Sequence, residues 1–444
     1  MRAKRTKKFG KTTTMKRRIL TIVAILALVC GGWARWGTLV DSNQTAGLAK
    51  NVVCAATVEE NDAASRKGEA NAIERRLGEL RKTTTPDLRL NVFAWEIDEM
   101  SQTIRLETTL EVARQIVEET MASEFPKWSV KTILLPDENS ELDGRFFGWA
   151  NFSTIQIRKE PRYSAELTTQ ALMGTPMRVL KREGGWILVQ NADGYLGYTT
   201  VGSVKATTRD EFNRWVDAKK LIWLDAFGSI YSEPDENSAP ISDLTAGNVT
   251  VWKNEETCGD FYRVETPDGR LGWIRKNGAT EWSAWLDANK ELTAERLITT
   301  ARRFLGTPYV WGGTSAKGVD CSGLTSLSFY LNGFNILRDV SLLQGEGVEI
   351  DLTQGRSALK PGDLLIFGSK RADGSTYYRH VAIYLGDDRF IHSATSVRIN
   401  SLDPSAPDFD RYNASQLIKA VRYVGVPESE YFKWIGNNPF YRKR

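Results

Sequence analysis

The stretch TPYVWGGTSAKGVDCSGL, residues 307–324, constrains the fold and the chemistry of this chain more than any other part of it. Asp320 is a residue type that caps helices, and the apolar residues after it recur at helical spacing, which predicts a helix beginning at Cys321. Free backbone N–H groups in a first helical turn favour an anion, so this position is expected to lower the pKa of the thiol. Because a thiolate attacks carbonyl carbons, we interpret Cys321 as a nucleophile.

The base for this thiol has to be one of two histidines, since the chain contains only His380 and His392. Both lie in HVAIYLGDDRFIHSA, residues 380–394, which is typical of a β-hairpin that turns at GDD. A three-residue loop would pair Leu385 with Arg389 and place both histidines on one face, whereas a two-residue loop would place them on opposite faces. We expect the three-residue loop. His380 would then take the thiol proton and return it to a leaving amine, while His392 would hold the other ring nitrogen of His380.

The same motif supplies donors for a tetrahedral oxyanion, which are the backbone N–H of Cys321 and the hydroxyl of Tyr309. Taken singly, a cysteine in an apolar helix is usually an inert core residue, and a histidine in a strand is usually a hydrogen-bonded core residue. The joint occurrence of DCSG at a helix start and of both histidines in one hairpin favours catalysis. Cys54 and Cys258 have no such surroundings, so we interpret them as structural.

Length and composition indicate several globular domains. At about 150 residues per domain, 444 residues correspond to about three units, and 41% apolar and 26% charged residues are typical of folded proteins. The four cysteines form no CxxC pair and there are only two histidines. We therefore expect no zinc site, no other metal and no cofactor.

The formal net charge of +4 does not indicate nucleic-acid binding, because it is concentrated at one end of the chain. Residues 1–18 contain nine Lys or Arg and no acid, so the remainder carries 4 − 9 = −5. An apolar stretch at 19–29 follows, and this order of regions is typical of an export signal. Residues 1–45 are interpreted as a signal sequence or membrane tether, with a cleaved signal, a lipid on Cys30 and an uncleaved anchor all left open. The protein is expected to be exported to the periplasm or cell envelope.

Residues 46–150 are predicted to form a small α+β unit that carries no chemistry. A polar linker is expected near 41–64. The patterns after it predict a helix at 65–82, a strand at 88–95, a helix at 106–117 and a strand at 130–135.

Residues 151–208 and 225–285 are a diverged repeat, which we assign to two domains at 151–208 and 209–288. DGYLGY at 193–198 matches DGRLGW at 268–273 with an offset of 75 residues, and Gly174 corresponds to Gly247 with an offset of 73. Short strands rich in β-branched and aromatic residues, separated by glycine turns, predict two small antiparallel barrels. The nucleophile and both histidines fall in a further domain, residues 289–426, which is followed by a tail at 427–444.

The motifs at 307–324 and 380–394 resemble those of the NlpC-type family of papain-like cysteine peptidases, which cleave peptide bonds in bacterial cell-wall peptides. In that family the triad corresponds here to Cys321, His380 and His392. Each repeat resembles a bacterial SH3-like domain. The resemblance implies a multidomain α+β protein, in which two SH3-like β-barrels and a small α+β unit precede a papain-like catalytic domain of helices packed on an antiparallel sheet.

Two SH3-like domains before such a catalytic domain are similar to the arrangement in γ-D-glutamyl-L-diamino-acid endopeptidases of the dipeptidyl-peptidase VI type. That resemblance implies hydrolysis between D-Glu and Lys or diaminopimelate in stem peptides with a free N-terminal L-Ala, through a thioacyl-enzyme. It also implies that carboxylates hold the L-Ala amine and that an aromatic residue blocks longer substrates. Asp339 and Glu166 fit the first role and Tyr195 the second, while Tyr309, Trp311 and Ser322 would line the pocket. Glu166 and Tyr195 are equally interpretable as a solvated loop charge and a barrel core residue.

Three other functions stay open. The chain could be an endopeptidase that acts on intact peptidoglycan, with the barrels as wall-binding modules. It could be a non-catalytic wall-binding protein, or an enzyme that transfers acyl groups on the same scaffold. The partners expected in each case are peptidoglycan stem peptides or muropeptides, with no nucleic acid and with a membrane tether through the N-terminus.

Overall fold

The structure is a computed structural model that describes the backbone of residues 42–138 and 140–443, with side chains described from residue 62 onward. The chain divides into two compact units at the bond between Ala72 and Ile73. The apolar stretch at 19–29 and Cys30, on which the prediction of a signal or tether depends, lie outside the described residues. Within the described part, no helix is both long and apolar enough to cross a membrane.

The linker predicted near 41–64 is wrong, because helix α2 already begins at Ser42 and runs to Thr84. The sequence of α2 contains no proline and is rich in alanine and charged residues of high helix propensity. The polar composition of 41–64 therefore belongs to a helix and not to a linker. From Ile73 onward the helix buries Ile73 and Leu77. Glu74 on the same segment accepts a hydrogen bond from the indole N–H of Trp95, at 2.8 Å.

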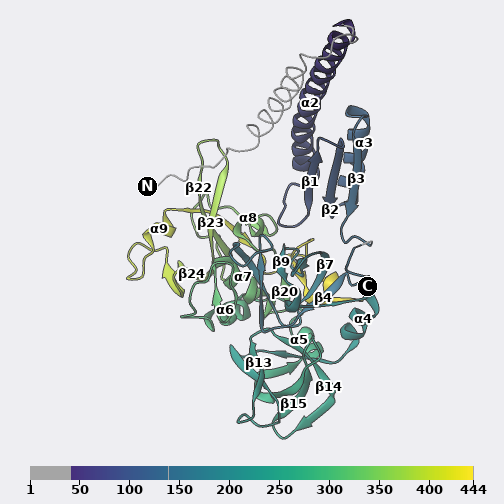
Figure 1. Cartoon of the computed structure of the whole chain (residues 1–444). Helices are drawn as coiled ribbons and strands as arrows, with labels where there is room; N and C mark the ends of the chain where they lie inside the picture. The colour runs from purple at the N-terminus through teal and green to yellow at the C-terminus, as the bar shows by residue number, and fades with distance from the viewer. Residues whose placement is uncertain (1–41, 139, 444) are drawn as a thin grey trace, which may run out of the picture. The chain divides into compact units, whose positions relative to one another are not determined.

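A three-stranded sheet follows in the order β1-β2-β3. Its strands are β1 (Phe93–Asp98), β2 (Thr103–Thr108) and β3 (Ser129–Leu134), and helix α3 (Glu111–Glu124) connects β2 to the parallel strand β3 (Figure 1). The predicted α+β character and the last strand are confirmed. Leu106 lies in β2 and not in the helix, since it alternates with exposed residues as a half-buried strand does.

Two seven-stranded barrels come next, and their strands repeat in the same order. The bounds of the first are β4 (Phe147–Ala150), β5 (Thr154–Arg158), β6 (Leu167–Leu172), β7 (Pro176–Glu183), β8 (Trp186–Asn191), β9 (Leu196–Thr200) and β10 (Val204–Thr207). Those of the second, after helix α4 (Arg209–Asp217), are β11 (Lys220–Trp223), β12 (Phe227–Tyr231), β13 (Pro240–Thr245), β14 (Val249–Cys258), β15 (Phe261–Glu265), β16 (Leu271–Arg275) and β17 (Ala279–Glu281). The start of β14 lies 249 − 176 = 73 residues after that of β7, and β15 lies 261 − 186 = 75 after β8. Both offsets agree with the repeat found in the sequence.

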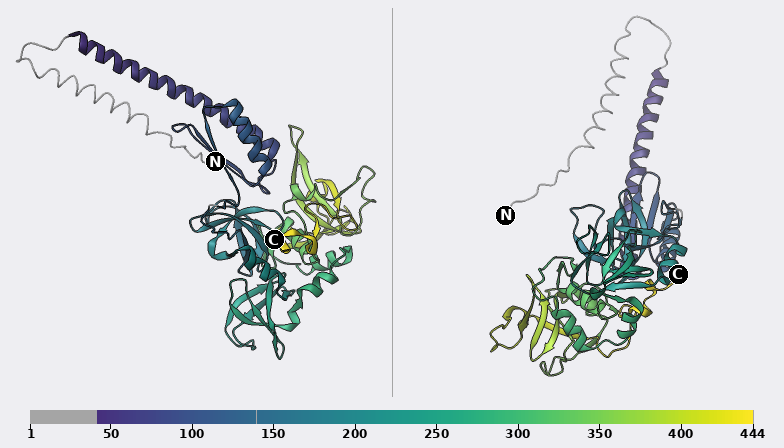
Figure 2. Two further views of the ribbon diagram at one scale, coloured as in Figure 1. Left: turned by 90° about the vertical axis from the view of Figure 1, so that its right-hand side faces the viewer. Right: turned by 90° about the horizontal axis from the view of Figure 1, so that it is seen from below.

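The last domain packs helices on a six-stranded sheet in the order β21-β26-β22-β23-β24-β25. The helices of this domain are α6 (Ala294–Arg302), α7 (Cys321–Tyr330), α8 (Val340–Leu343) and α9 (Arg411–Ala414), whereas α5 (Trp282–Ala288) contacts strands β11 and β17 of the second barrel. The sheet strands are β21 (Val348–Ile350), β22 (Leu364–Lys370), β23 (Thr376–Gly386), β24 (Arg389–Ser393), β25 (Val397–Ser401) and β26 (Leu417–Arg422), and the short strands β18 (Thr314–Ser315), β19 (Gly318–Val319), β20 (Phe334–Asn335) and β27 (Lys433–Trp434) form two-stranded ribbons. Figures 1 and 2 draw the strands of the six-stranded sheet in green to yellow.

The hairpin that carries both histidines has a different turn from the one we expected. Gly386 pairs with Arg389, so only Asp387 and Asp388 form the loop, with φ of 50° and 56°. Aspartate tolerates this left-handed backbone better than most residues do, which favours a two-residue turn here. A bulge at Leu385 then restores the expected register, because Tyr384 pairs with Phe390 and Ile383 with Ile391. The predicted loop length is wrong, whereas the pairing it was meant to produce is right.

Candidate active site

Helix α7 begins as the sequence predicted. The Asp320 carboxylate accepts a hydrogen bond from the Gly323 N–H, at 2.7 Å, and so caps the helix in front of Cys321. The helix start lies so close to the preceding loop that a Cβ on Gly323 would be 1.9 Å from the Gly313 carbonyl oxygen. Cys321 is therefore the first residue of a helix whose start packs closely against the preceding loop. The N–H of Cys321 has no acceptor within that helix.

A buried ion pair holds this helix start in place. Arg338, which is 1% exposed, donates to the second oxygen of Asp320 at 2.5 Å, and the Gly312 N–H donates to the same oxygen at 2.8 Å. The guanidinium also donates to the Thr168 carbonyl at 2.9 Å and to the Thr314 hydroxyl at 2.7 Å. The ion pair thus joins the nucleophile's helix to strand β6 of the first barrel. Sequence reasoning missed Arg338, although it stands next to Asp339 in LRDVS.

The two histidines form a hydrogen-bonded relay that ends on an asparagine. His380 Nε2 lies 2.7 Å from His392 Nδ1, and His392 Nε2 lies 3.0 Å from Asn400 Oδ1. Asn400 Nδ2 donates to the Asp408 carbonyl at 3.0 Å, which fixes the amide so that its oxygen faces the imidazole. An acceptor at Asn400 requires a proton on His392 Nε2, and His392 Nδ1 then accepts from His380 Nε2. This assignment leaves the lone pair of His380 on Nδ1.

Sequence reasoning did not find Asn400. It lies on β25, the strand after His392, and its contact with the imidazole depends on the register of β24 against β25. A polar residue in a strand is too common a signal to single it out.

The resting charge state differs from the one we expected for the thiol. Burial and the charge of Asp320 raise the pKa of Cys321 to about 11, while the N–H groups of Val381 and Ser322 lower it by less. Burial, together with the charge of His392, lowers the pKa of His380 well below 6.5. The expected lowering of the thiol pKa is therefore wrong, because desolvation outweighs the helix terminus. Both directions favour a neutral thiol beside a neutral imidazole in the resting protein.

The contact with Val381 places the thiol beside strand β23, one residue from His380. A neutral imidazole with its lone pair on Nδ1 can accept a proton, which is what a general base has to do. The arrangement suits a mechanism in which the thiol is deprotonated as it attacks.

One pocket of about 610 Å³ opens at Cys321. It brings together seven of the nine predicted site residues, which are Cys321, Ser322, Tyr309, Trp311, Asp339, Glu166 and Tyr195. His380 and His392 are not part of its lining, whereas Tyr378 and Arg379, which precede His380, are. The pocket is therefore built from the catalytic domain and the first barrel together.

Contacts across this pocket explain how the two domains share it. Trp311, although 63% exposed, donates from its indole N–H to Glu166 at 3.1 Å. Tyr195 is largely buried and donates from its hydroxyl to Asp339 at 2.7 Å. Burial and the neighbouring charges of Cys321 and Asp320 raise the pKa of Tyr309, so this hydroxyl keeps its proton as an oxyanion donor must.

The N-terminal α+β unit also reaches the pocket, against our expectation that it carries no chemistry. Residues 88, 89 and 91–94 are part of its lining. Arg89 donates to Asp339 at 3.0 Å and to the Ser341 hydroxyl at 2.7 Å. No pattern in the sequence could have indicated this contact, because it joins residues 250 positions apart.

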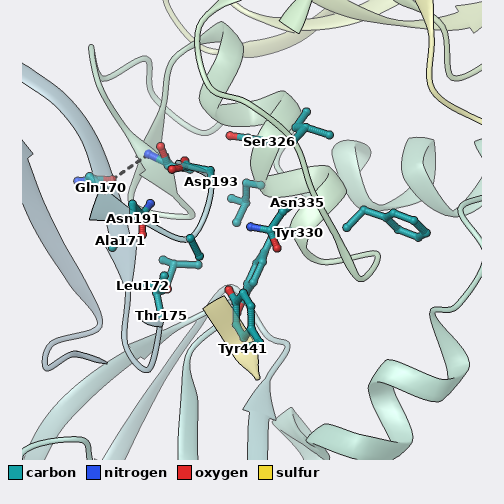
Figure 3. Close-up of a pocket in the computed structure, with 15 residues that line it drawn as sticks. Gln170, Ala171, Leu172, Thr175, Asn191, Asp193, Ser326, Tyr330, Asn335 and Tyr441 are labelled. Atoms are coloured by element: carbon teal, nitrogen blue, oxygen red, sulfur yellow. Dashed lines mark hydrogen bonds between the residues drawn. The ribbon is translucent and has the colours of Figure 1, made fainter. Parts of the chain in front are cut away.

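A second cavity lies elsewhere, between the first barrel and helix α7 (Figure 3). Gln170, Asn191, Tyr330 and Tyr441 are among the residues that line it, and the Gln170 side chain accepts a hydrogen bond from the Thr314 N–H at 2.9 Å. None of the nine predicted site residues lines this cavity.

The part of the chain whose side chains are described contains no group of three or more His, Cys, Asp or Glu that could hold a metal ion. Cys258 is exposed and free, and the side chain of Cys54 lies outside the described residues.

Comparison with family models identifies two segments. Residues 306–417 match the NlpC/P60 family, and residues 157–201 match the bacterial dipeptidyl-peptidase Sh3 domain. The first match contains the nucleophile and both histidines. The second contains Glu166 and Tyr195.

Comparison with individual proteins gives longer matches. The chain is 30% identical over 257 residues to dipeptidyl-peptidase 6 of Lysinibacillus sphaericus, a match that covers 56% of this chain and 89% of that protein. It is 29% identical over 284 residues to γ-D-glutamyl-L-lysine dipeptidyl-peptidase of Bacillus cereus, covering 62% of this chain and 81% of the relative. The crystal structure of an NlpC/P60 family protein from Bacillus cereus superposes with a TM-score of 0.53 at 25% identity, covering 63% of this chain and 99% of that one.

The histidine relay predicts that Asn400 positions the base. Asn400→Leu removes the acceptor that fixes the tautomer, so kcat should fall by about 10–100-fold while KM and the unfolding temperature stay near those of the unaltered protein. Asn400→Asp keeps an acceptor oxygen and should retain more activity than the leucine variant. Steady-state kinetics with thermal unfolding of both variants checks this, and equal losses in the two would contradict it.

The charge state of the resting pair predicts how Cys321 reacts with iodoacetamide in the absence of substrate. Since only the thiolate is alkylated, the rate at Cys321 should rise about tenfold per pH unit through neutral pH and level off near pH 11. Mass spectrometry of the peptide that contains Cys321 separates this rate from labelling of Cys258, and Cys321→Ala provides the background. A rate that levels off below pH 8 would show a thiolate–imidazolium pair instead.

Proposed function

Because the chain belongs to the NlpC/P60 family of cysteine peptidases, we propose that it hydrolyses the bond between γ-D-Glu and the L-diamino acid, Lys or diaminopimelate, in peptidoglycan stem peptides with a free N-terminal L-Ala. The observation that carries this proposal is that Cys321, Asp339 and Glu166 line one pocket. The names of the two matched dipeptidyl-peptidases support the choice of bond.

Acylation begins with attack of the Cys321 sulfur on the γ-carbonyl carbon of D-Glu. His380 Nδ1 takes the thiol proton during the attack, and the imidazolium that forms is stabilised by the relay to His392 and Asn400. The new oxyanion is bound by the Cys321 N–H and the Tyr309 hydroxyl. Cleavage of the C–N bond follows, with the His380 proton transferred to the α-amine of the leaving diamino acid.

Deacylation repeats these steps with water. His380, again neutral, takes a proton from a water molecule that attacks the thioester carbon. The thiolate leaves and takes the proton from His380, which releases the dipeptide as a γ-carboxylic acid on D-Glu that then loses its proton to solvent. Every step uses groups of the protein and water alone.

Recognition of the free L-Ala terminus is assigned to Asp339 and Glu166. An ammonium group removed from water needs a carboxylate to replace its hydration, and a neutral N-acyl group cannot provide that charge. Tyr195 closes this end of the pocket and holds Asp339 through its hydroxyl. N-blocked stems would bring no positive charge to these carboxylates, and longer stems would meet this wall.

We also propose that the protein acts outside the cytoplasm, where it would degrade peptides released from the cell wall for recycling. The basic residues of 1–18 and the apolar stretch after them support export. A tether to the membrane through this segment belongs to the same proposal.

The proposed function predicts which substrates are cleaved. Purified full-length protein should release L-Ala-D-Glu from L-Ala-γ-D-Glu-L-Lys or its diaminopimelate counterpart, more slowly from the N-acetylated peptides, and negligibly from intact sacculi. Cys321→Ala should abolish the release, while Cys258→Ala, at an exposed cysteine in the second barrel, should leave it unchanged. Chromatography with mass detection measures the products.

Other outcomes would favour other functions. Cleavage of sacculi at a rate comparable to that of the free peptide would indicate an endopeptidase of the intact wall. Sacculus binding without any cleavage would indicate a wall-binding protein. Release that persists in Cys321→Ala would contradict the proposed nucleophile.

A further inference from the structure

Arg89 links the N-terminal unit to the proposed amine subsite through a single guanidinium. It lies in the segment between α2 and β1, where its Nε and Nη2 pair with the carboxylate of Asp87 at 2.9 and 2.5 Å. The remaining nitrogen, Nη1, donates to Asp339 Oδ2 at 3.0 Å and to the Ser341 hydroxyl at 2.7 Å. Arg89 thus pairs with Asp87 in its own loop and with Asp339 of the catalytic domain at the same time.

Asp339 is held in an unusual conformation for this contact. Its φ is 69°, in the left-handed region, and its carboxylate makes no capping hydrogen bond to helix α8, which it precedes. The carboxylate is directed instead to Tyr195 and Arg89, and both donate to Oδ2. Neither contact uses the second oxygen, Oδ1. Such strain in a non-glycine residue persists where the surroundings impose it, as they do at binding sites.

The charges that face Asp339 nearly balance. Asp87, Arg89 and Asp339 together carry one net negative charge, and the buried pair of Arg338 with Asp320 carries none. An ammonium group that enters the subsite would meet Asp339 with the Arg89 guanidinium already bound to it. The side chains of Arg89 and Asp339 are each about one-third exposed. The two cations therefore compete for Asp339 on the wall of the pocket and not in a sealed interior.

We propose that Arg89 is a specificity-determining residue, an internal cation that competes with the substrate's ammonium group for Asp339 and so sets the strength of free-amine recognition. This inference rests on the proposed function, because it takes the free L-Ala terminus as the ligand of Asp339. When substrate enters, the guanidinium yields Asp339 and keeps its bidentate pairing with Asp87, so neither charge is left alone.

The two kinds of substrate respond differently to the loss of this cation. Without Arg89, Asp339 keeps the neutral hydroxyl of Tyr195 as a partner but has no cation beside it, so an ammonium group gains the whole of the charge attraction. A neutral N-acetyl group gains nothing, since it brings no positive charge to that carboxylate. Arg89 therefore weakens the preference of the subsite for a free amine over an N-acetyl group.

Kinetics near pH 7, where the L-Ala amine is protonated, tests this with variants that act in opposite directions. Arg89→Ala should lower KM for L-Ala-γ-D-Glu-L-Lys about tenfold with kcat little changed, and should widen the preference over the N-acetyl peptide by a similar factor. Asp87→Asn leaves Asp339 as the sole carboxylate that balances Arg89, so KM for the free-amine peptide should rise. Arg89→Lys keeps a cation but not the two-nitrogen pairing with Asp87, so its KM should lie between those of the unaltered protein and Arg89→Ala.

General damage to the loop would shift KM in the same direction in Arg89→Ala and in Asp87→Asn. Opposite shifts of KM in these two variants therefore separate competition from disruption. Arg76→Ala, which removes an ion pair with Glu124 in the same N-terminal unit, serves as the matched control and should leave both KM values unchanged. A higher KM for the free-amine peptide in Arg89→Ala, or no change, would overturn the inference while the proposed function stands. If the unaltered protein neither cleaves the peptide nor binds L-Ala-γ-D-Glu by calorimetry, the proposed function and the inference both fail.

Discussion

The buried ion pair of Asp320 with Arg338 is the contact on which the rest of the site depends. Asp320 immediately precedes the nucleophile, and Arg338 immediately precedes Asp339, so one interaction fixes both ends of the pocket. Through Thr168 it also sets the position of the barrel strand β6. Removing one partner of such a pair leaves a buried charge uncompensated, at a cost of about 3–5 kcal/mol. Loss of this ion pair would therefore affect catalysis, substrate recognition and domain packing together.

Much of the fold and the centre of the site could be predicted from the sequence, because these features depend on local signals. The aspartate cap in front of Cys321 is a local property, and so is the short run of β-branched and aromatic residues that makes a strand of 380–385. The barrels could be recognised from a repeat whose offsets of 73 and 75 residues reappear in the strands. Asp339, Glu166 and Tyr195 came from resemblance, and the structure places all three on the pocket of Cys321.

The features that escaped prediction depend on contacts between distant parts of the chain or on burial. Arg89 and Arg338 act through carboxylates and carbonyls far along the sequence, and no pattern marks them. The pKa of Cys321 follows from how much water the fold removes around the thiol, which the helix-terminus argument does not include. The bulge at Leu385 resulted from two aspartates that favour a tight turn, and it compensated for the loop length that we predicted wrongly. Local preference set the turn, whereas the packing of the sheet set the register.

The central claim is that Cys321 attacks the γ-carbonyl of D-Glu, and trapping the thioacyl-enzyme tests it most directly. The protein is mixed with L-Ala-γ-D-Glu-L-Lys, quenched in acid within the first turnover, digested and analysed by mass spectrometry. The account predicts an L-Ala-γ-D-Glu acyl group on the peptide that contains Cys321, and none in Cys321→Ala. An acyl group that includes the diamino acid, an acyl group on another residue, or turnover without any adduct at Cys321 would contradict it.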